Sequence, residues 1–177
     1  MQKMALSSAL ALALVLPALA PDETSASANF VNAEGLEIGN ATLTQGEDGV
    51  SITGELTGVA PGEHGFHFHQ VGDCDATSQF ESAGSHFNPT GHKHGLENPE
   101  GPHAGDLPNV TASEAGTVTL DLSTDTVSLV EGDEAYVFDE DGTALVLHAN
   151  ADDHRTDPSG NSGDRIACGV IEAVSRP

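Results

Sequence analysis

Short apolar runs with a period of two recur along most of this chain. Side chains alternate between the two faces of a β-strand, so this spacing is typical of strands with one buried face. Turn signals such as Glu47-Asp48-Gly49 and Asp141-Gly142 separate the runs, and no window sustains a helical period. The pattern predicts an all-β sandwich or barrel of about seven or eight strands. Besides a strand that ends at His69, the predicted strands are Leu36 to Leu43, Val50 to Leu56, Val118 to Leu122, Val127 to Val130, Ala135 to Phe138, Ala144 to His148 and Arg165 to Val174.

Two stretches break the strand pattern, residues 70–116 and 149–164. Both are rich in Gly, Asp, Asn, Pro and His. Loops of this length inside a compact domain are usually functional or disordered. The chain has 177 residues and no internal repeat or low-complexity linker, which predicts one domain of ordinary size.

The N-terminus has the pattern of a secretory signal peptide. Met1 to Lys3 is a short positive start, the residues that follow are nearly all Ala, Leu and Val, and Ala18-Leu19-Ala20 is a small-residue cleavage site. The apolar run is short for a membrane span, so we expect export from the cytoplasm. We assign residues 1–20 to the signal peptide, with Ala26-Ser27-Ala28 as an alternative cleavage site, and residues 29–177 to the folded domain.

Acidic residues dominate the charge of the chain. Five Lys and Arg residues against 28 Asp and Glu residues give a formal net charge of -23, and loss of Lys3 with the signal peptide leaves 4 - 28 = -24. Such a surface repels phosphate backbones and anionic lipid headgroups. We therefore expect neither nucleic acid nor a membrane as a partner.

The two cysteines, Cys74 and Cys168, form an even pair in a chain expected to be exported. An oxidising compartment favours a disulfide between them over the alternative of two reduced cysteines in the core. Closing a loop of 168 - 74 = 94 residues stabilises a fold by about 4 kcal/mol in the chain-entropy model.

Nine histidines stand out in a chain that is otherwise poor in cations. His67 and His69 end a predicted strand, and because side chains alternate, both imidazoles point to one face in a chelating geometry. Imidazole with a carboxylate suits zinc, and an all-histidine group suits Cu(II). The spacing predicts two metal sites, one of strand histidines and one of loop residues. The further candidate ligands are His86, His92, His94, His103, Asp106, His148, Asp152 and His154.

Six strings between about residues 29 and 174 carry a resemblance to a known family. They are Gly65-Phe66-His67-Phe68-His69, Gly84-Ser85-His86-Phe87-Asn88-Pro89, Lys93-His94-Gly95, His103-Ala104-Gly105-Asp106-Leu107, Leu147-His148-Ala149-Asn150-Ala151-Asp152-Asp153 and Gly163-Asp164-Arg165-Ile166-Ala167-Cys168-Gly169-Val170-Ile171. Together they closely resemble the copper, zinc superoxide dismutases, and the signal peptide with Gly72-Asp73-Cys74 resembles the exported bacterial type. The resemblance implies an eight-stranded Greek-key β-sandwich or flattened barrel with two long functional loops.

The resemblance also implies a ligand set with one copper and one zinc per subunit. Copper would be held by His67, His69, His86 and His148, and zinc by His86, His94, His103 and Asp106. His86 would then bridge the two metals. Asp152 resembles the family carboxylate that accepts a hydrogen bond from one histidine of each site, and Cys74 with Cys168 matches the family disulfide.

The implied activity is the disproportionation of superoxide to dioxygen and hydrogen peroxide, through alternate reduction and oxidation of copper. Arg165 resembles the arginine that positions the superoxide anion beside copper, and His86 supplies a proton to the second superoxide. The implied role is antioxidant defence in the periplasm or outside the cell. Monomer and homodimer both remain open, because exported members of the family use more than one assembly.

We expect minor roles for the remaining histidines, Lys93 and Arg155. His64 matches a structural histidine and is expected to be a hydrogen-bond strut, and His92 occupies a variable basic position. His154, Arg155 and Lys93 are the candidates for adding positive charge near the substrate entrance. Such charge matters because a chain this acidic repels a small anion at long range.

Two other functions fit parts of the pattern. A metal-buffering module would use the histidine clusters but would have no use for Arg165 or for a bridging ligand. A zinc hydrolase could use His94, His103 and Asp106 around an open coordination position, but His86 as a fourth ligand closes that position.

Overall fold

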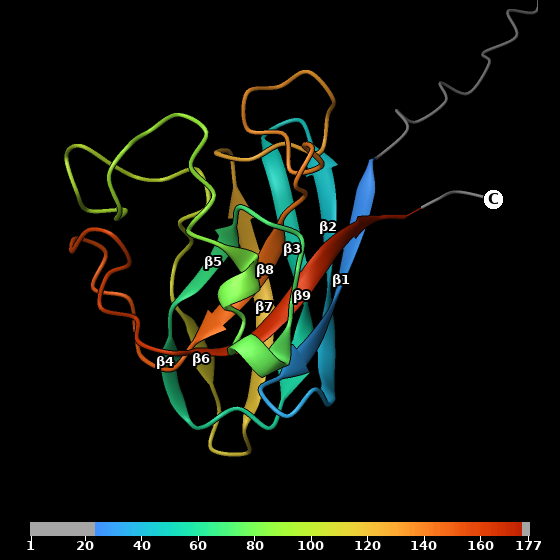
Figure 1. The fold of residues 1–177 in the computed structure, drawn as a ribbon, viewed down its shortest axis with the longest axis vertical. Coiled ribbons are helices and arrows are strands. Elements are labelled where there is room, and N and C mark those ends of the chain that lie inside the picture. The colour runs from blue at the N-terminus through green and yellow to red at the C-terminus, as the bar shows by residue number, and fades with distance from the viewer. Residues whose placement is uncertain (1–23, 175–177) are drawn as a thin grey trace, which may run out of the picture.

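The computed structural model describes residues 24–174. The predicted signal peptide lies outside them. Nine antiparallel strands and two short 3-10 helices make up the fold (Figure 1). The strands are β1 (Ser25–Asn32), β2 (Glu37–Gly46), β3 (Gly49–Thr57), β4 (Gly62–His64), β5 (Phe66–His69), β6 (Val110–Ala112), β7 (Thr117–Thr124), β8 (Ala144–His148) and β9 (Arg165–Ala173), and the helices are η1 (Ala76–Ser78) and η2 (Glu81–Ala83).

The strands form one sheet in the order β4-β6-β7-β3-β2-β1-β9-β8-β5. β4 and β5 lie at opposite ends of this order although Gly65 alone separates them in the chain. The sheet therefore curls into a nearly closed barrel, in which Gly65 connects the two edge strands along the chain. Gly65 also extends the pairing of β5 with β8 by donating to Asn150 O (2.8 Å) and accepting from His148 N (2.9 Å). The arrangement β4-β6-β7-β3 is a Greek key. The predicted all-β flattened barrel is confirmed, with nine strands where eight were expected.

The prediction of strands at Val127 to Val130 and Ala135 to Phe138 is wrong. These segments form a loop with one isolated bridge, between Ser128 and Tyr136. Its backbone is held partly by a side chain, because Leu129 N donates to Gln45 Oε1 (2.8 Å) instead of to a neighbouring strand. Val127, Leu129 and Val137 nevertheless point into the core, which explains why the alternation resembles that of a strand.

Two strands were missed, β1 and β6. β1 is rich in Ser, Ala and Asn and lacks a run of large apolar residues, yet it pairs with β2 on one side and β9 on the other. Ala26, Ala28 and Phe30 are fully buried. β1 begins four residues before the predicted domain start at residue 29. β6 has three residues and lies inside the predicted loop 70–116.

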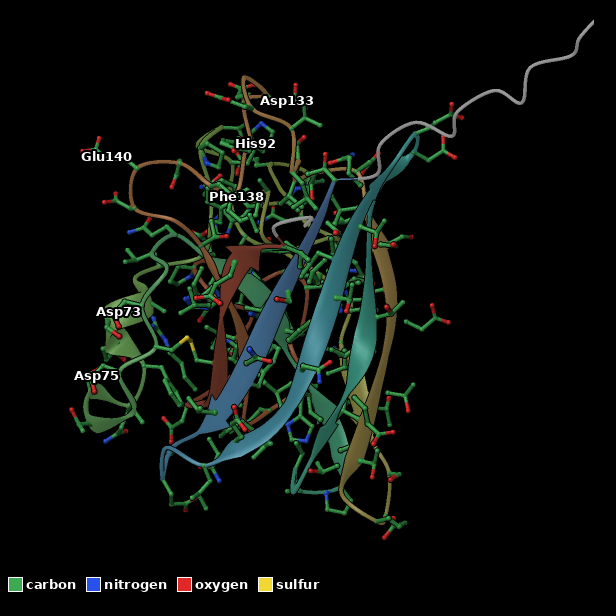
Figure 2. The ribbon with its side chains drawn as sticks, turned by 90° about the vertical axis from the view of Figure 1, so that its right-hand side faces the viewer. Asp73, Asp75, His92, Asp133, Phe138 and Glu140 are labelled. Atoms are coloured by element: carbon green, nitrogen blue, oxygen red, sulfur yellow. A yellow bond between two sulfur atoms is a disulfide. The ribbon has the colours of Figure 1, made fainter. Side chains whose placement is uncertain are left out.

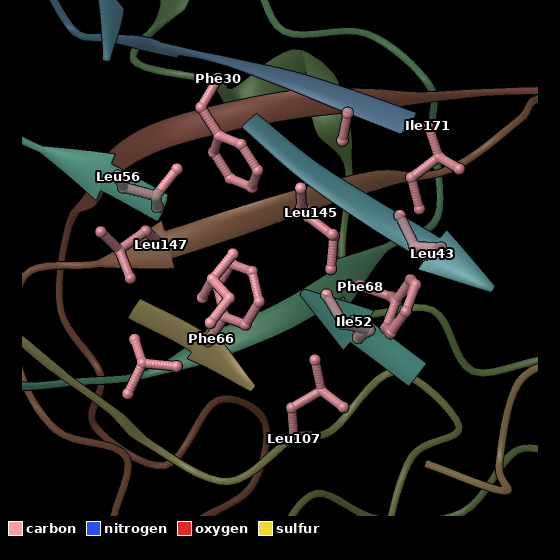
Figure 3. Close-up of a cluster of buried hydrophobic side chains, with 14 of the residues drawn as sticks. Phe30, Leu43, Ile52, Leu56, Phe66, Phe68, Leu107, Leu145, Leu147 and Ile171 are labelled. Carbon is pink, nitrogen blue, oxygen red and sulfur yellow. The ribbon is translucent and has the colours of Figure 1, made fainter. Parts of the chain in front are cut away.

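Alternation along β5 and β8 separates the core from the site. Phe66 and Phe68 of β5 lie in the main core with Leu145 and Leu147 of β8 (Figure 3). The histidines between and after these residues face the opposite side, which is also buried because the long loops cover it. The barrel therefore has its core inside and a second buried region under its loops.

Cys74 and Cys168 form the predicted disulfide, with Cα atoms 5.6 Å apart (Figure 2, yellow bond). The bond ties the segment that carries η1 and η2 to β9. Beneath it a small apolar cluster includes Phe80 and Val146. Within residues 24–174, no helix has the length and apolar character needed to cross a membrane.

Candidate metal centre

The residues of the site gather along the outer edge of β5. One side of β5 pairs with β8, and two segments of the loop between β5 and β6 lie along the other side. Gly105 permits this approach, because a Cβ there would lie 2.5 Å from Phe68 O. Isolated bridges join His67 to Asp106 and His69 to His86. Residues far apart in the sequence are thus brought to one strand by backbone pairing.

Four buried histidines form what we call the strand group: His67, His69, His86 and His148. Each offers one nitrogen, and these nitrogens lie within 4.8 Å of one another. The far nitrogens are held by the protein, with His69 Nδ1 donating to Gly84 O (2.9 Å) and His148 Nδ1 to Gly163 O (3.2 Å). Nδ1 of His67 and Nε2 of His86 are buried without a hydrogen-bond partner. Four convergent imidazoles of this kind fit copper.

The second set, the loop group, consists of His86, His94, His103 and Asp106, all buried. The Nδ1 atoms of the three histidines lie 3.0, 3.0 and 3.3 Å from Asp106 Oδ1. Tetrahedral zinc with bonds of 2.0–2.1 Å places its ligand atoms about 3.3 Å apart. The donor set and the spacing therefore fit zinc.

His86 belongs to both groups. Its Nδ1 faces Asp106 Oδ1 in the loop group, and its Nε2 belongs with the strand group. The His67 and His86 rings lie with centroids 4.1 Å apart. One imidazole can thus bridge two metal ions through its two nitrogens.

The carboxylate of Asp152 contacts one histidine of each group. Its Oδ2 accepts from His67 Nε2 (2.6 Å) and its Oδ1 from His94 Nε2 (3.0 Å). A carboxylate on the far nitrogen fixes the ring orientation and the tautomer of a metal-binding histidine. This is the contact that the sequence resemblance implies for Asp152.

The two groups differ in their electrostatics. Burial lowers the pKa of His86 to about 4 and that of His148 to about 3, and it also lowers the pKa values of His67 and His69. In the loop group, burial opposes charge on His94, but hydrogen bonds to Asp106 and Asp152 raise its pKa to about 9. The same histidine contacts hold the pKa values of both carboxyl groups well below their usual range, against the effect of burial. The strand group is therefore neutral at pH 7, whereas the loop group carries charge.

A surface cavity of about 280 Å³ reaches the strand group. Arg165 lies in its wall with His69, His86 and His148, and its guanidinium donates to Phe80 O (2.5 Å) and Gly84 O (2.7 Å). Two acidic residues, Glu81 and Asp164, line the same cavity. A small anion can approach the histidines here beside one fixed positive charge.

Lys93, Arg155 and His154, the candidates for positive charge near the entrance, are not among the residues that line this cavity. Lys93 pairs with Glu100 (2.7 Å) and Arg155 with Glu97, so their charges are locally neutralised.

The other histidines outside the two groups have structural contacts. His154 lies within 3.3 Å of the Asn109 side chain. His64 bridges His148 O and Ala60 O, each at 2.8 Å, as the predicted strut. His92 lies in the loops at one end of the barrel, with Nδ1 3.1 Å from Pro102 O (Figure 2).

An antiparallel β-barrel with two adjoining metal-binding groups that share a histidine defines a metalloprotein with a dinuclear centre. A family model described as Copper/zinc superoxide dismutase (SODC) matches residues 37–171. The chain belongs to the copper/zinc superoxide dismutase family, a family of oxidoreductases whose cofactors are copper and zinc.

Relatives match over most of the chain. "Superoxide dismutase [Cu-Zn] 2" of Aquifex aeolicus is 46% identical over 159 residues, 89% of this chain and 92% of the relative. "Superoxide dismutase [Cu-Zn]" of Caulobacter vibrioides is 43% identical over 150 residues, 84% and 86% of the two chains. The crystal structure of a SOD-like protein from Bacillus subtilis aligns with a TM-score of 0.79 at 40% identity, covering 82% of this chain and 97% of that chain.

Sequence reasoning missed Asn109, Gly160 and Glu81. Asn109 contacts the backbone of Asp152, Gly160 lies against its carboxylate, and Glu81 lines the cavity. None of the three carries a metal-ligand signal in the sequence, and each acquires its place only through the packing of loops.

Proposed function

We propose that this chain is a superoxide dismutase that converts two superoxide anions and two protons to dioxygen and hydrogen peroxide. The observation that carries the proposal is the position of His86, one buried imidazole with a nitrogen in each metal-binding group. A bridge between two unlike donor sets is of no use to metal storage, and the fourth ligand closes the open position that a zinc hydrolase needs.

The proposed ligands follow from the two groups, with one copper and one zinc per chain. The strand group, His67, His69, His86 and His148, holds copper, and the loop group, His86, His94, His103 and Asp106, holds zinc. When bound, copper supplies a one-electron redox couple, and zinc supplies a fixed positive charge on the His86 ring. Asp152 orients His67 and His94, so that one carboxylate aligns a ring of each group.

His86 is the proposed proton donor. Its Nε2 is buried and lacks a protein partner, and the residue is one of those that line the cavity. This atom can take up a proton in one half of the cycle and give it to the second superoxide in the other half. The ring does not need to move far, because Nδ1 remains beside Asp106.

Arg165 is the proposed anion-positioning group. Two carbonyl oxygens fix its guanidinium in the cavity wall, and at neutral pH an arginine keeps its charge. The guanidinium can therefore hold superoxide beside the strand group without losing a proton to it.

We also propose export, with cleavage after Ala20. The disulfide fits an oxidising compartment such as the periplasm. Cleavage after Ala28 would remove half of β1, including the buried Ala26, whereas Thr24 O already accepts a hydrogen bond from Gln45 N (2.9 Å). The intact mass of the exported protein distinguishes the two sites.

The test is inhibition of superoxide-driven dye reduction by the purified protein, with copper and zinc measured on the same sample. We expect one equivalent of each metal per chain and activity that follows copper content. Full occupancy of both metals with activity no greater than that of the buffer would refute the dismutase proposal and leave metal storage as the better one.

A further inference from the structure

Asn109 holds the backbone of Asp152 from outside both metal-binding groups. It lies just before β6, and its side-chain amide makes a reciprocal pair of hydrogen bonds with one residue of the 149–164 loop. Asn109 Nδ2 donates to Asp152 O (2.9 Å), and Asp152 N donates to Asn109 Oδ1 (2.8 Å). The amide thus fixes both backbone polar groups of Asp152, as a paired strand would.

The carboxylate of Asp152 is fixed on its other sides as well. His154 N donates to Oδ1 (2.6 Å), and Asn109 Nδ2 also lies 3.3 Å from His154 Nε2. Gly160 closes the remaining approach, because with φ +60° a Cβ there would lie 1.7 Å from Asp152 Oδ1. Little freedom is left to a carboxylate that must meet His67 and His94 at the same time.

Asp152 belongs to a loop without regular secondary structure, and the backbone hydrogen bonds within the loop, from Asn150 N to Ser162 O and from Asp153 N to Gly160 O, lie on either side of it. The Asn109 pair ties this loop to the start of β6, which is part of the barrel. The Asn109 side chain contacts neither metal-binding group. It can nevertheless control the orientation of the Asp152 carboxylate, which aligns a histidine of each group.

We propose that Asn109 is a positioning residue for both metal sites, acting through Asp152. Loss of its amide allows the Asp152 backbone to shift, and the hydrogen bonds to His67 and His94 lengthen together. Zinc and copper affinity then fall in parallel although every ligand is still present. This inference rests on the ligand assignment proposed above.

The experiment compares Asn109→Ala with Val110→Ala and Thr111→Val in the full exported protein. Val110 is buried in the core and Thr111 is exposed on β6, so these variants perturb the same strand without touching Asp152. Zinc affinity is measured by competition with a chromogenic chelator, and cobalt bound in place of zinc reports the ligand geometry through its visible spectrum. For Asn109→Ala we expect about a tenfold loss of zinc affinity, at the lower end of the effect of removing a group that orients a ligand, and an altered cobalt spectrum.

The controls decide between positioning and general stability. Val110→Ala should lower the melting temperature but keep zinc affinity within twofold of the wild type, and Thr111→Val should change neither. Equal zinc loss in Val110→Ala and Asn109→Ala, or wild-type affinity in Asn109→Ala, would overturn the inference. If Asn109→Ala does not fold, Asn109→Asp decides, because it keeps the shape and the acceptor oxygen but removes the donor to Asp152 O. A wild-type protein that binds no zinc would instead refute the ligand assignment itself.

Discussion

The strand group and the loop group share His86 but are built in different ways. His67 and His69 stand on β5 and His148 ends β8, so the barrel sets their positions. His94, His103 and Asp106 all lie in the loop between β5 and β6, and hydrogen bonds from ring nitrogens and backbone N–H groups to carboxylates hold them. The difference indicates that the proposed copper site is preformed by the sheet, whereas the proposed zinc site depends on charge and loop contacts.

Replacement of a single proposed ligand should have the largest effect and should separate the two groups most clearly. We expect His148→Ala to lose copper and at least about 100-fold of the activity while it keeps zinc, since losing a ligand costs at least as much as losing a group that orients one. His103→Ala should lose zinc while copper stays bound. Metal analysis and the dye-reduction assay on both variants check this, and activity retained in His148→Ala would contradict the copper assignment.

Zinc and copper uptake should differ in their dependence on pH. His94 must lose its proton before Nδ1 can bind a metal, and its pKa is raised to about 9. Below pH 9 zinc affinity should therefore fall by about tenfold per pH unit. Burial lowers the pKa values of the strand histidines not shared with zinc, so copper affinity should depend less steeply on pH than zinc affinity does. Competition titrations of the metal-free protein measure both slopes, and equal slopes would contradict the electrostatic difference.

The disulfide supports the segment that carries His86 and holds Arg165 through Phe80 O and Gly84 O. Its reduction should lower stability by about 4 kcal/mol in the chain-entropy model, or about 10 °C in melting temperature. The double variant Cys74→Ser with Cys168→Ser should behave like the reduced protein, and reductant should not change it further. An unchanged melting temperature on reduction would argue against a stabilising bond.

The smallest expected effects concern the field around the cavity. Among residues 24–174, Arg165 is the one Lys or Arg side chain without a carboxylate within 4 Å, and the net charge repels anions. Arg165→Ala should lower the rate by about tenfold, whereas moderate salt should leave the wild-type rate level or raise it by up to about twofold. Glu81→Gln should raise the rate slightly at low salt, and Glu55→Gln on β3 is the matched control. A steep fall of the wild-type rate with salt would show that attraction dominates.

The sequence predicted most of the site and part of the fold. The resemblance of six strings to a known family named the residues that the structure brings together in the two groups. β1 was missed because its inward residues include the small Ala26 and Ala28, which give a weak apolar signal. The false strands at residues 127–138 arose because core burial alternates there without strand pairing.

The contacts between loops could not be predicted from the sequence, for a different reason. Asn109, Gly160 and Glu81 gain their roles from segments that meet only after the barrel closes. For Lys93 and Arg155, folding removes a role that the sequence suggested, because glutamates that the fold brings close neutralise their charges.

The covering of β5 by ligand-bearing loop segments has a consequence for solubility. An uncovered strand edge is a template for pairing with another chain, and Phe66–His69 is apolar at alternate positions. Here the backbones beside His86 and Asp106 occupy that edge. The segments that carry two of the proposed ligands therefore also shield this strand edge from pairing with another chain.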